Sequence, residues 1–286
     1  MLDCLCVGLS TMDVIASVDG WPREDEKRRA RAVVVDGGGP AGTAACVLGK
    51  YGLKTGILSF IGQDEWTPFI REGFRRHDVS TKSLRVVPGA SNAVSMVLAN
   101  ARNGSRTIVW NARGLRGESL PVRAPRARCL HFDGHLMELS IRLAREGLRR
   151  GALTSFDCGS LKPGWEALAA LTRVFIASSR FTRQLGLSVP AALLALRERF
   201  GFSVAVTEGA RGVSFFDEKS RRVRRLPQRR FASVDTTGCG DVFHGAFLAA
   251  ALRGRAFEES LRFAQEVAGE KSLRLGGRKG LPERRL

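Results

Sequence analysis

Short apolar runs that alternate with longer amphipathic stretches constrain the fold of this chain more than any other feature. The runs at 4–9, 55–61 and 129–132 are brief and continuous, which is typical of strands buried on both faces of a sheet. Segments such as 41–51 and 136–149 repeat their apolar residues at helical spacing. Strands that alternate with helices form β-α units. The sequence therefore predicts an α/β fold with a central, mostly parallel sheet and helices on both faces.

Two segments break this rhythm because they carry strand patterns with no helix between them. The first covers about 14–36. The second, about 91–112, contains two alternating runs on either side of the turn-rich residues 101–104, which is a hairpin signal. We expect these segments to form a small β-sheet that serves as a lid. No internal repeat or long linker is visible, so residues 1–286 are expected to form a single domain with this lid appended.

The composition argues against several classes of protein. No apolar run reaches the roughly 18–20 residues that a membrane span needs, and the N-terminal residues lack the pattern of a secretion leader. The six cysteines form no C-x-x-C pair, which argues against a zinc ribbon and against a disulfide scaffold. We therefore expect a cytoplasmic protein with no membrane partner.

The net charge of +18 comes from 46 Lys and Arg against 28 Asp and Glu. The arginine clusters are spread along the chain and lack the interleaved aromatic residues of a nucleic-acid-binding stripe. A solvated basic surface that draws anionic ligands at low salt is therefore favoured, and no specific nucleic-acid partner is expected. A non-catalytic basic protein that binds nucleic acid remains one alternative.

The segment 234–248 carries the clearest chemical signal. After Asp241 the apolar residues return at helical spacing, so a buried helix is expected to start there, with Gly238, Cys239 and Gly240 at its N-terminus. Glycines leave the backbone N–H groups uncovered. Together with the positive end of the helix dipole, these groups form a site suited to a phosphate.

Asp241 stands directly after this predicted phosphate site. An Asp in a first helical turn stabilises the helix by roughly 0.3–1 kcal/mol, but that role does not explain the flanking glycines. A base beside a phosphate cradle is what phosphoryl transfer to an alcohol requires. It accepts the hydroxyl proton while the N–H groups offset the growing charge. The residues therefore indicate a phosphotransferase with Asp241 as general base.

Residues 235–241, D-T-T-G-C-G-D, resemble the C-terminal signature of the PfkB/ribokinase family of sugar and nucleoside kinases, which usually reads D-T-x-G-A-G-D. Cys239 replaces the usual Ala, one small side chain for another. The resemblance implies a ribokinase-like fold, a general-base role for Asp241, and an oxyanion cradle formed by the amides of residues 238–241.

Further segments resemble the family in the same order along the chain. They are 8–13 and 37–45 near the sugar, 207–212 near the nucleotide, and 104–108 and 276–282, which are similar to the ketohexokinase and sulfofructose kinase branch. The resemblance implies acceptor contacts for Asp13, Lys27, Gly38, Gly39, Thr43 and Asn111. It implies phosphate or ATP contacts for Arg106, Thr207, Gly209, Gly212 and Gly277.

The resemblance also implies a reaction, namely transfer of the γ-phosphate of ATP to a primary hydroxyl of a small sugar. A ketose is the favoured acceptor and a nucleoside is the alternative. Gly134 stands where the sulfofructose kinases have the Arg that grips the sulfonate, so a sulfosugar is only one option among the acceptors. A homodimer formed through the lid is expected as well.

Two metal ions belong to the expected cofactors. Mg²⁺ should accompany ATP, but residues 176–181 lack the N-x-x-E carboxylate, so no protein ligand is assigned and the nucleotide could hold the ion. The resemblance further implies a possible K⁺ site near Asp235 and Thr237.

Residues 37–42 also satisfy the dinucleotide fingerprint G-x-G-x-x-G, and Asp64 lies 22 residues past Gly42. An NAD(P)-binding oxidoreductase is therefore a second alternative. It is disfavoured because the glycines do not follow the first strand and because residues 235–241 would have no role. The P-loop motif G-x-x-x-x-G-K-[ST] is absent from the sequence.

Overall fold

The computed structural model describes residues 1–115, 122–201 and 203–283. Its main sheet has the strand order β14-β13-β12-β11-β10-β9-β1-β4-β5, and β6 pairs with β4. In this order all pairs from β5 across to β12 are parallel, as is the β4–β6 pair, whereas β13 pairs antiparallel with both β12 and β14 at the edge. The bounds are β1 (Leu2–Val7), β4 (Thr55–Ile61), β5 (Val79–Ser80), β6 (Leu84–Val86), β9 (Ala127–Phe132), β10 (Leu153–Cys158), β11 (Val174–Ser178), β12 (Ser203–Thr207), β13 (Val213–Asp217) and β14 (Arg222–Leu226).

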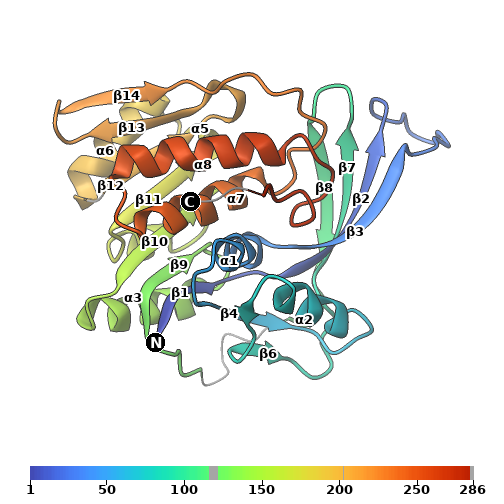
Figure 1. Ribbon diagram of the computed structural model, residues 1–286, viewed down its shortest axis with the longest axis horizontal. Coiled ribbons are helices and arrows are strands. Elements are labelled where there is room, and N and C mark those ends of the chain that lie inside the picture. Colours follow the sequence, from blue (N-terminus) through green and yellow to red (C-terminus); the bar gives the residue numbers. More distant parts are fainter. Residues whose placement is uncertain (116–121, 202, 284–286) are drawn as a thin grey trace.

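Helices cover both faces of this sheet (Figure 1). One face packs against α1 (Pro40–Lys50), α2 (Thr67–Arg75), α7 (Cys239–Ala251) and α8 (Phe257–Lys271). The other packs against α3 (Met137–Arg149), α4 (Trp165–Ala169), α5 (Ser179–Gln184) and α6 (Val189–Phe200). Alternate residues of β1 enter the two apolar cores, Cys4 and Cys6 one and Leu5 and Val7 the other. The predicted α/β fold with a mostly parallel central sheet is confirmed.

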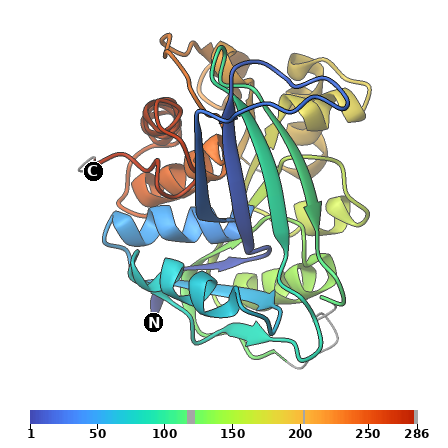
Figure 2. The same ribbon diagram turned by 90° about the vertical axis from the view of Figure 1, so that its right-hand side faces the viewer.

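A second, smaller sheet stands beside the first and is seen on the right of Figure 1 and face-on in Figure 2. Its order is β3-β2-β7-β8, where β2 is Thr11–Val18, β3 is Ala32–Gly38, β7 is Val94–Asn100 and β8 is Arg106–Asn111. The sequence indicated strands from about 14–36 and 91–112. The β2–β3 ladder extends further at its inner end, because Thr11 pairs with Gly38. Asp13 therefore lies within a strand of the smaller sheet.

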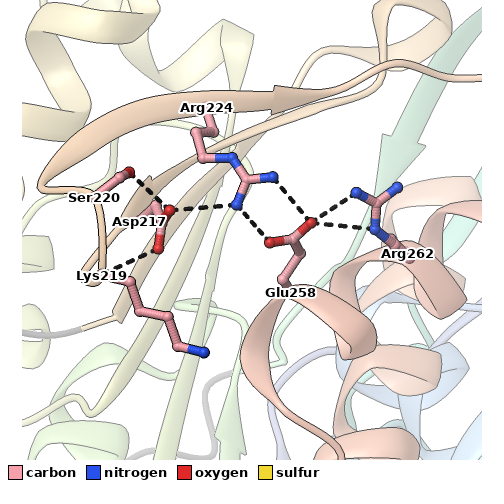
Figure 3. Close-up of polar contacts among 6 residues, drawn as sticks. All are labelled: Asp217, Lys219, Ser220, Arg224, Glu258 and Arg262. Carbon is pink, nitrogen blue, oxygen red and sulfur yellow. Dashed lines mark hydrogen bonds and ion pairs between the residues drawn. The ribbon is translucent and has the colours of Figure 1, made fainter.

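The basic run at residues 221–225 is not simply solvated. Arg224 on β14 donates to Asp217 (3.3 Å) and to Glu258 at the start of α8 (2.7 Å), and Glu258 also accepts from Arg262 (2.7 Å), as Figure 3 shows. This network ties the edge hairpin to α8. Exposed pairs of this kind contribute little stability each, about 0–1 kcal/mol.

No helix in the three described stretches combines the length and apolar character needed to cross a bilayer.

Candidate active site

Three carboxylates gather where the central strands of the main sheet end. β9 and β10 are parallel neighbours in which Phe132 pairs with Phe156, so the next residues along, Asp133 and Asp157, lie side by side. Asp241 lies in the first turn of α7, and the charges of Asp157 and Asp133 both act to raise its pKa. The carboxyl ends of parallel strands are where ligands bind in open α/β sheets.

The predicted phosphate cradle lies at the start of α7. Gly238 adopts the left-handed conformation (φ 73°) that lets the chain turn into the helix. The Cys239 N–H, a predicted member of the cradle, donates to the Thr236 carbonyl oxygen (3.2 Å) and so has an acceptor within the chain. The N–H groups of Gly238, Gly240 and Asp241 have no acceptor among the described residues. These three donors can bind an anion.

Asp241 has the proton affinity of a base that works near neutrality. Its side chain is partly buried, and this burial, followed by the charge of Asp157, raises its pKa to about 7. Arg106 and His244 act in the opposite direction. A carboxylate with this pKa can accept a hydroxyl proton during a reaction at neutral pH.

Sequence reasoning missed the residues directly behind Asp241. His244 Nε2 lies 3.1 Å from Asp157 Oδ1, both side chains are buried, and the ring of His131 lies 5.6 Å from that of His244. Burial opposes ionisation of Asp157, but His244 lowers its pKa, and burial lowers the pKa of His131 to about 3. His244 lies three residues after Asp241 and therefore on the same face of α7. This spacing could have indicated that the two side chains lie near each other.

Asp13 and the glycine segment meet at the inner end of the smaller sheet. The buried Asp13 carboxylate accepts a hydrogen bond from Thr11 Oγ1 (2.7 Å), and burial raises its pKa. A Cβ atom on Gly38 would lie 2.1 Å from Asp13 Oδ2, so only glycine permits this approach. Gly39 (φ 83°) starts α1, in which Thr43 is buried, and a Cβ atom added to Gly238 would lie 3.8 Å from Thr43 Cγ2. Of the predicted acceptor residues, Thr43 thus adjoins the cradle, and Gly38 and Gly39 connect it to Asp13.

Arg106 connects the smaller sheet to the cradle. Its Nη1 donates to Thr236 Oγ1 (2.9 Å), and Thr236 Oγ1 donates to the Gly104 carbonyl oxygen (2.6 Å). Lys27 and Asn111 are exposed, the first in the loop between β2 and β3 and the second at the end of β8. No described contact joins either of these two to the Asp241 cluster.

The residues predicted on the nucleotide side divide into two groups. Thr207 ends β12, and Gly209 (φ 61°) and Gly212 (φ 100°) bound the short helix η1 (Gly209–Arg211) that follows. Gly277 lies beside the cradle, because a Cβ atom on Gly238 would lie 3.3 Å from its Cα. The buried Glu208, which accepts from Ser214 Oγ (2.6 Å), was missed.

The turn before the cradle is built around a buried ion pair. Asp235 accepts N–H bonds from Thr237 (2.7 Å) and Gly276 (2.9 Å), and its Oδ2 lies 3.6 Å from Nζ of the buried Lys271. Thr237 Oγ1 is buried and has no described partner. These oxygens fit a monovalent cation better than a divalent one, because Lys271 already balances the Asp235 carboxylate.

Within the described part of the chain, no three His, Cys, Asp or Glu side chains are arranged so that they could hold a metal ion. The residues from Ile176 to Phe181 carry no carboxylate, which fits a Mg²⁺ ion held by phosphate oxygens and water.

The dinucleotide reading of residues 37–42 is not supported by their position. They join β3 of the smaller sheet to α1, whereas the fingerprint belongs to the first β-α turn of a parallel sheet. Asp64 is engaged by Asn92, whose backbone N–H donates to it (2.7 Å), and by the Trp66 N–H (3.0 Å). Asp64 therefore stabilises the loop that leads into α2, and it does not serve as the acidic residue of a dinucleotide site.

Comparison with known proteins settles the family. The model of the pfkB family carbohydrate kinases matches residues 1–140 and 179–284. This chain belongs to the PfkB family. Ketohexokinase from Mus musculus is 26% identical over 287 residues, which cover 93% of this chain and 95% of that protein. A nucleoside kinase from Methanothermobacter thermautotrophicus is 24% identical, covering 93% and 88%. The solved structure of a putative ribokinase from Agrobacterium tumefaciens superposes with a TM-score of 0.89 at 26% identity, covering 98% of this chain and 94% of that one.

As a PfkB-family carbohydrate kinase, the protein is a phosphotransferase with a ribokinase-like fold, and it acts on a sugar or a nucleoside. The predicted family, fold class and enzyme type are therefore confirmed, and the oxidoreductase and nucleic-acid alternatives are wrong.

The raised pKa of Asp241 also predicts a pH-dependent stability effect. The folded-state pKa of about 7 exceeds the ordinary value of 3.8, so the stability contributed by the protonated form is fully present below about pH 4 and is lost as pH rises through 7. Asp241→Asn removes the charge, so its gain in Tm over the wild type should grow between pH 5.5 and pH 8.5. Thermal denaturation at several pH values measures this gap. The exposed Asp25→Asn provides the control, and a gap independent of pH would contradict the assignment.

Proposed function

We propose that the protein transfers the γ-phosphate of ATP to a primary hydroxyl of a small sugar, with a ketose as the favoured acceptor. The observation that carries this proposal is the free carboxylate of Asp241 beside three unpaired backbone N–H groups at the start of a buried helix. The similarity to ketohexokinase over nearly the whole of both chains supports a ketose.

Each residue has one task in the proposed reaction. Asp241 accepts the proton of the acceptor hydroxyl as its oxygen bonds to the γ-phosphorus. The bond from that phosphorus to the β,γ-bridging oxygen breaks, and ADP leaves with the bonding electrons. The amides of Gly238, Gly240 and Asp241 and the guanidinium of Arg106 offset the negative charge on the transferred group. Mg²⁺, carried with the nucleotide, would neutralise part of the phosphate charge.

The acceptor would lie between the smaller sheet and the cradle. The buried Asp13 carboxylate can accept sugar hydroxyls, and Gly38, Gly39 and Thr43 line the approach to Asp241. Lys27 and Asn111 would complete the acceptor site from the sheet margin, where Asn111, paired with Val94, starts from the face opposite Asp13. At Gly134, a Cβ atom would lie 3.3 Å from Lys162 Cδ. The Lys162 side chain therefore passes close to the position from which an Arg at residue 134 would extend toward a sulfonate.

Thr207, Gly209, Gly212 and Gly277 would contact ATP from the other side of the cradle. K⁺, where bound, would be held by oxygens of Asp235 and Thr237 and would steady the turn that leads into the cradle.

ADP release over a panel of ketoses, aldoses, sulfosugars and nucleosides tests the proposal. We expect turnover with a ketose and a loss of kcat of at least about 10²-fold in Asp241→Asn, since general-base catalysis contributes 10²–10⁴-fold. ATP affinity, measured by thermal shift, should stay nearly unchanged in this variant. Near-wild-type turnover of Asp241→Asn would refute the base assignment, and turnover restricted to nucleosides would refute the acceptor class.

The pH profile gives a second test. Because Asp241 must be unprotonated, kcat/KM should rise with pH and level off above about 7. Asp157 raises this pKa through its charge, so Asp157→Asn should move the rising limb to lower pH. The exposed Asp19→Asn, whose carboxylate pairs with Arg31, should leave the limb in place. A limb that does not move in Asp157→Asn would contradict this electrostatic coupling.

We also propose a homodimer formed through the outer face of the smaller sheet. Val33, Met96 and Val109 lie on the face opposite Asp13 and are 61%, 66% and 69% exposed. Packing two copies of this face together about a two-fold axis would bury all three side chains in each copy.

Val109→Glu should convert the dimer to a monomer, because it places a charge in the buried centre of this contact. Light scattering after gel filtration measures the mass. Leu194→Glu on α6, 49% exposed and distant from the smaller sheet, is the matched control. A monomeric wild type, or a dimer that survives Val109→Glu, would exclude this interface.

A further inference from the structure

The smaller sheet presents a tryptophan to the same side as Asp13. Asp13 on β2 pairs with Ser95 on β7, and Ser95 pairs with Trp110 on β8. Side chains directly opposite one another on neighbouring strands point to the same face of a sheet. Asp13, Ser95 and Trp110 therefore form one row across three strands that lie side by side in Figures 1 and 2.

The exposure of the side chains differs between the two ends of this row. Asp13 and Ser95 are each 7% exposed, and the Ser95 side chain lies close enough to the Asp13 carboxylate to act against the rise in its pKa. Trp110 is 56% exposed. Neighbouring strands lie about 4.8 Å apart, so the backbones of Asp13 and Trp110 are roughly 10 Å apart. A single sugar ring with its hydroxyls spans such a gap, with Ser95 beneath it.

This face of β8 is turned toward the proposed reaction. Arg106, four residues before Trp110 and therefore on the same face, reaches Thr236 beside the cradle at 2.9 Å. Ile15 and Val97 on this face are buried in a small apolar cluster, whereas Trp110 takes no part in it. Packing within the chain therefore does not explain why a large aromatic ring is exposed at position 110. Its place in the row with Asp13 and Ser95 suggests a ligand contact instead.

We infer that Trp110 is an acceptor-binding residue whose indole packs against the apolar C–H face of a sugar ring while Asp13 accepts hydroxyls from its edge. The inference rests on the proposed function and makes it more specific, because it selects cyclic acceptors that have one apolar face. An aromatic ring supplies a flat apolar surface at low cost in conformational entropy.

Steady-state kinetics of two variants test this role. Trp110→Ala should raise KM for the best sugar of the panel by about tenfold and leave KM for ATP within about twofold. Trp110→Phe keeps a planar ring and should recover most of the loss. Trp21→Ala is the matched control, because Trp21 is 41% exposed in the loop between β2 and β3 and lies outside the row.

Intrinsic fluorescence gives a readout that does not depend on turnover. The same sugar, added without ATP, should change the tryptophan emission of the wild type and of Trp21→Phe, but not of Trp110→Phe. An unchanged sugar KM in Trp110→Ala would overturn the inference, as would a response that persists in Trp110→Phe. A Trp110→Ala variant that dissociates the dimer while keeping the wild-type sugar KM would also overturn it, because Trp110 would then belong to the interface. If the wild type phosphorylates no sugar, the proposed function fails instead.

Discussion

The buried carboxylate of Asp133 holds together the segments on which the site depends. Its oxygens accept N–H bonds from Leu9 (2.8 Å), Ala41 (3.1 Å) and His135 (2.9 Å). Leu9 lies between β1 and β2, and Ala41 lies in the first turn of α1, so one side chain joins the main sheet, the smaller sheet and the glycine segment. A Cβ atom on Gly8 would lie 2.0 Å from Asp133 Oδ1, which explains the glycine there. A buried carboxylate is tolerated only when such donors surround it.

The three clustered carboxylates differ in their partners, and this difference separates their chemistry. Asp133 is occupied by backbone N–H groups, and Asp157 is paired with His244. Asp241 has no comparable donor among the described residues, and it experiences the charges of the other two. The proton affinity therefore rises at the one carboxylate that faces the cradle. Burial and neighbouring charge are sufficient to raise the pKa of this aspartate into the range that a general base needs.

Sequence reasoning succeeded where the signal is local. The start of α7 beside Gly238 and Gly240 follows from glycines that precede a buried helix, and the hairpin around 101–104 follows from alternation on both sides of a turn. It failed where distant segments decide the outcome. The Asp157–His244 pair joins a strand to a helix 87 residues later in the chain, and no spacing rule connects them. The bond from the Cys239 N–H to the Thr236 carbonyl oxygen was not predicted, because it depends on a turn whose form the sequence does not specify. Strand β14 was not predicted because its sequence is rich in arginine and lacks an apolar pattern. Arg224 of this strand pairs with a carboxylate on another element.

Thr236 connects the smaller sheet to the start of α7. Its hydroxyl accepts from Arg106 and donates to Gly104, its backbone N–H also donates to the Gly104 carbonyl oxygen (3.1 Å), and its own carbonyl accepts from Cys239 (3.2 Å). Gly104 and Arg106 belong to the connection between β7 and β8 and to the start of β8, whereas Cys239 begins α7. A shift of β8 would therefore move the turn that holds Gly238 in its left-handed conformation. The hydrogen bonds of Thr236 therefore fix the start of β8 relative to the start of α7.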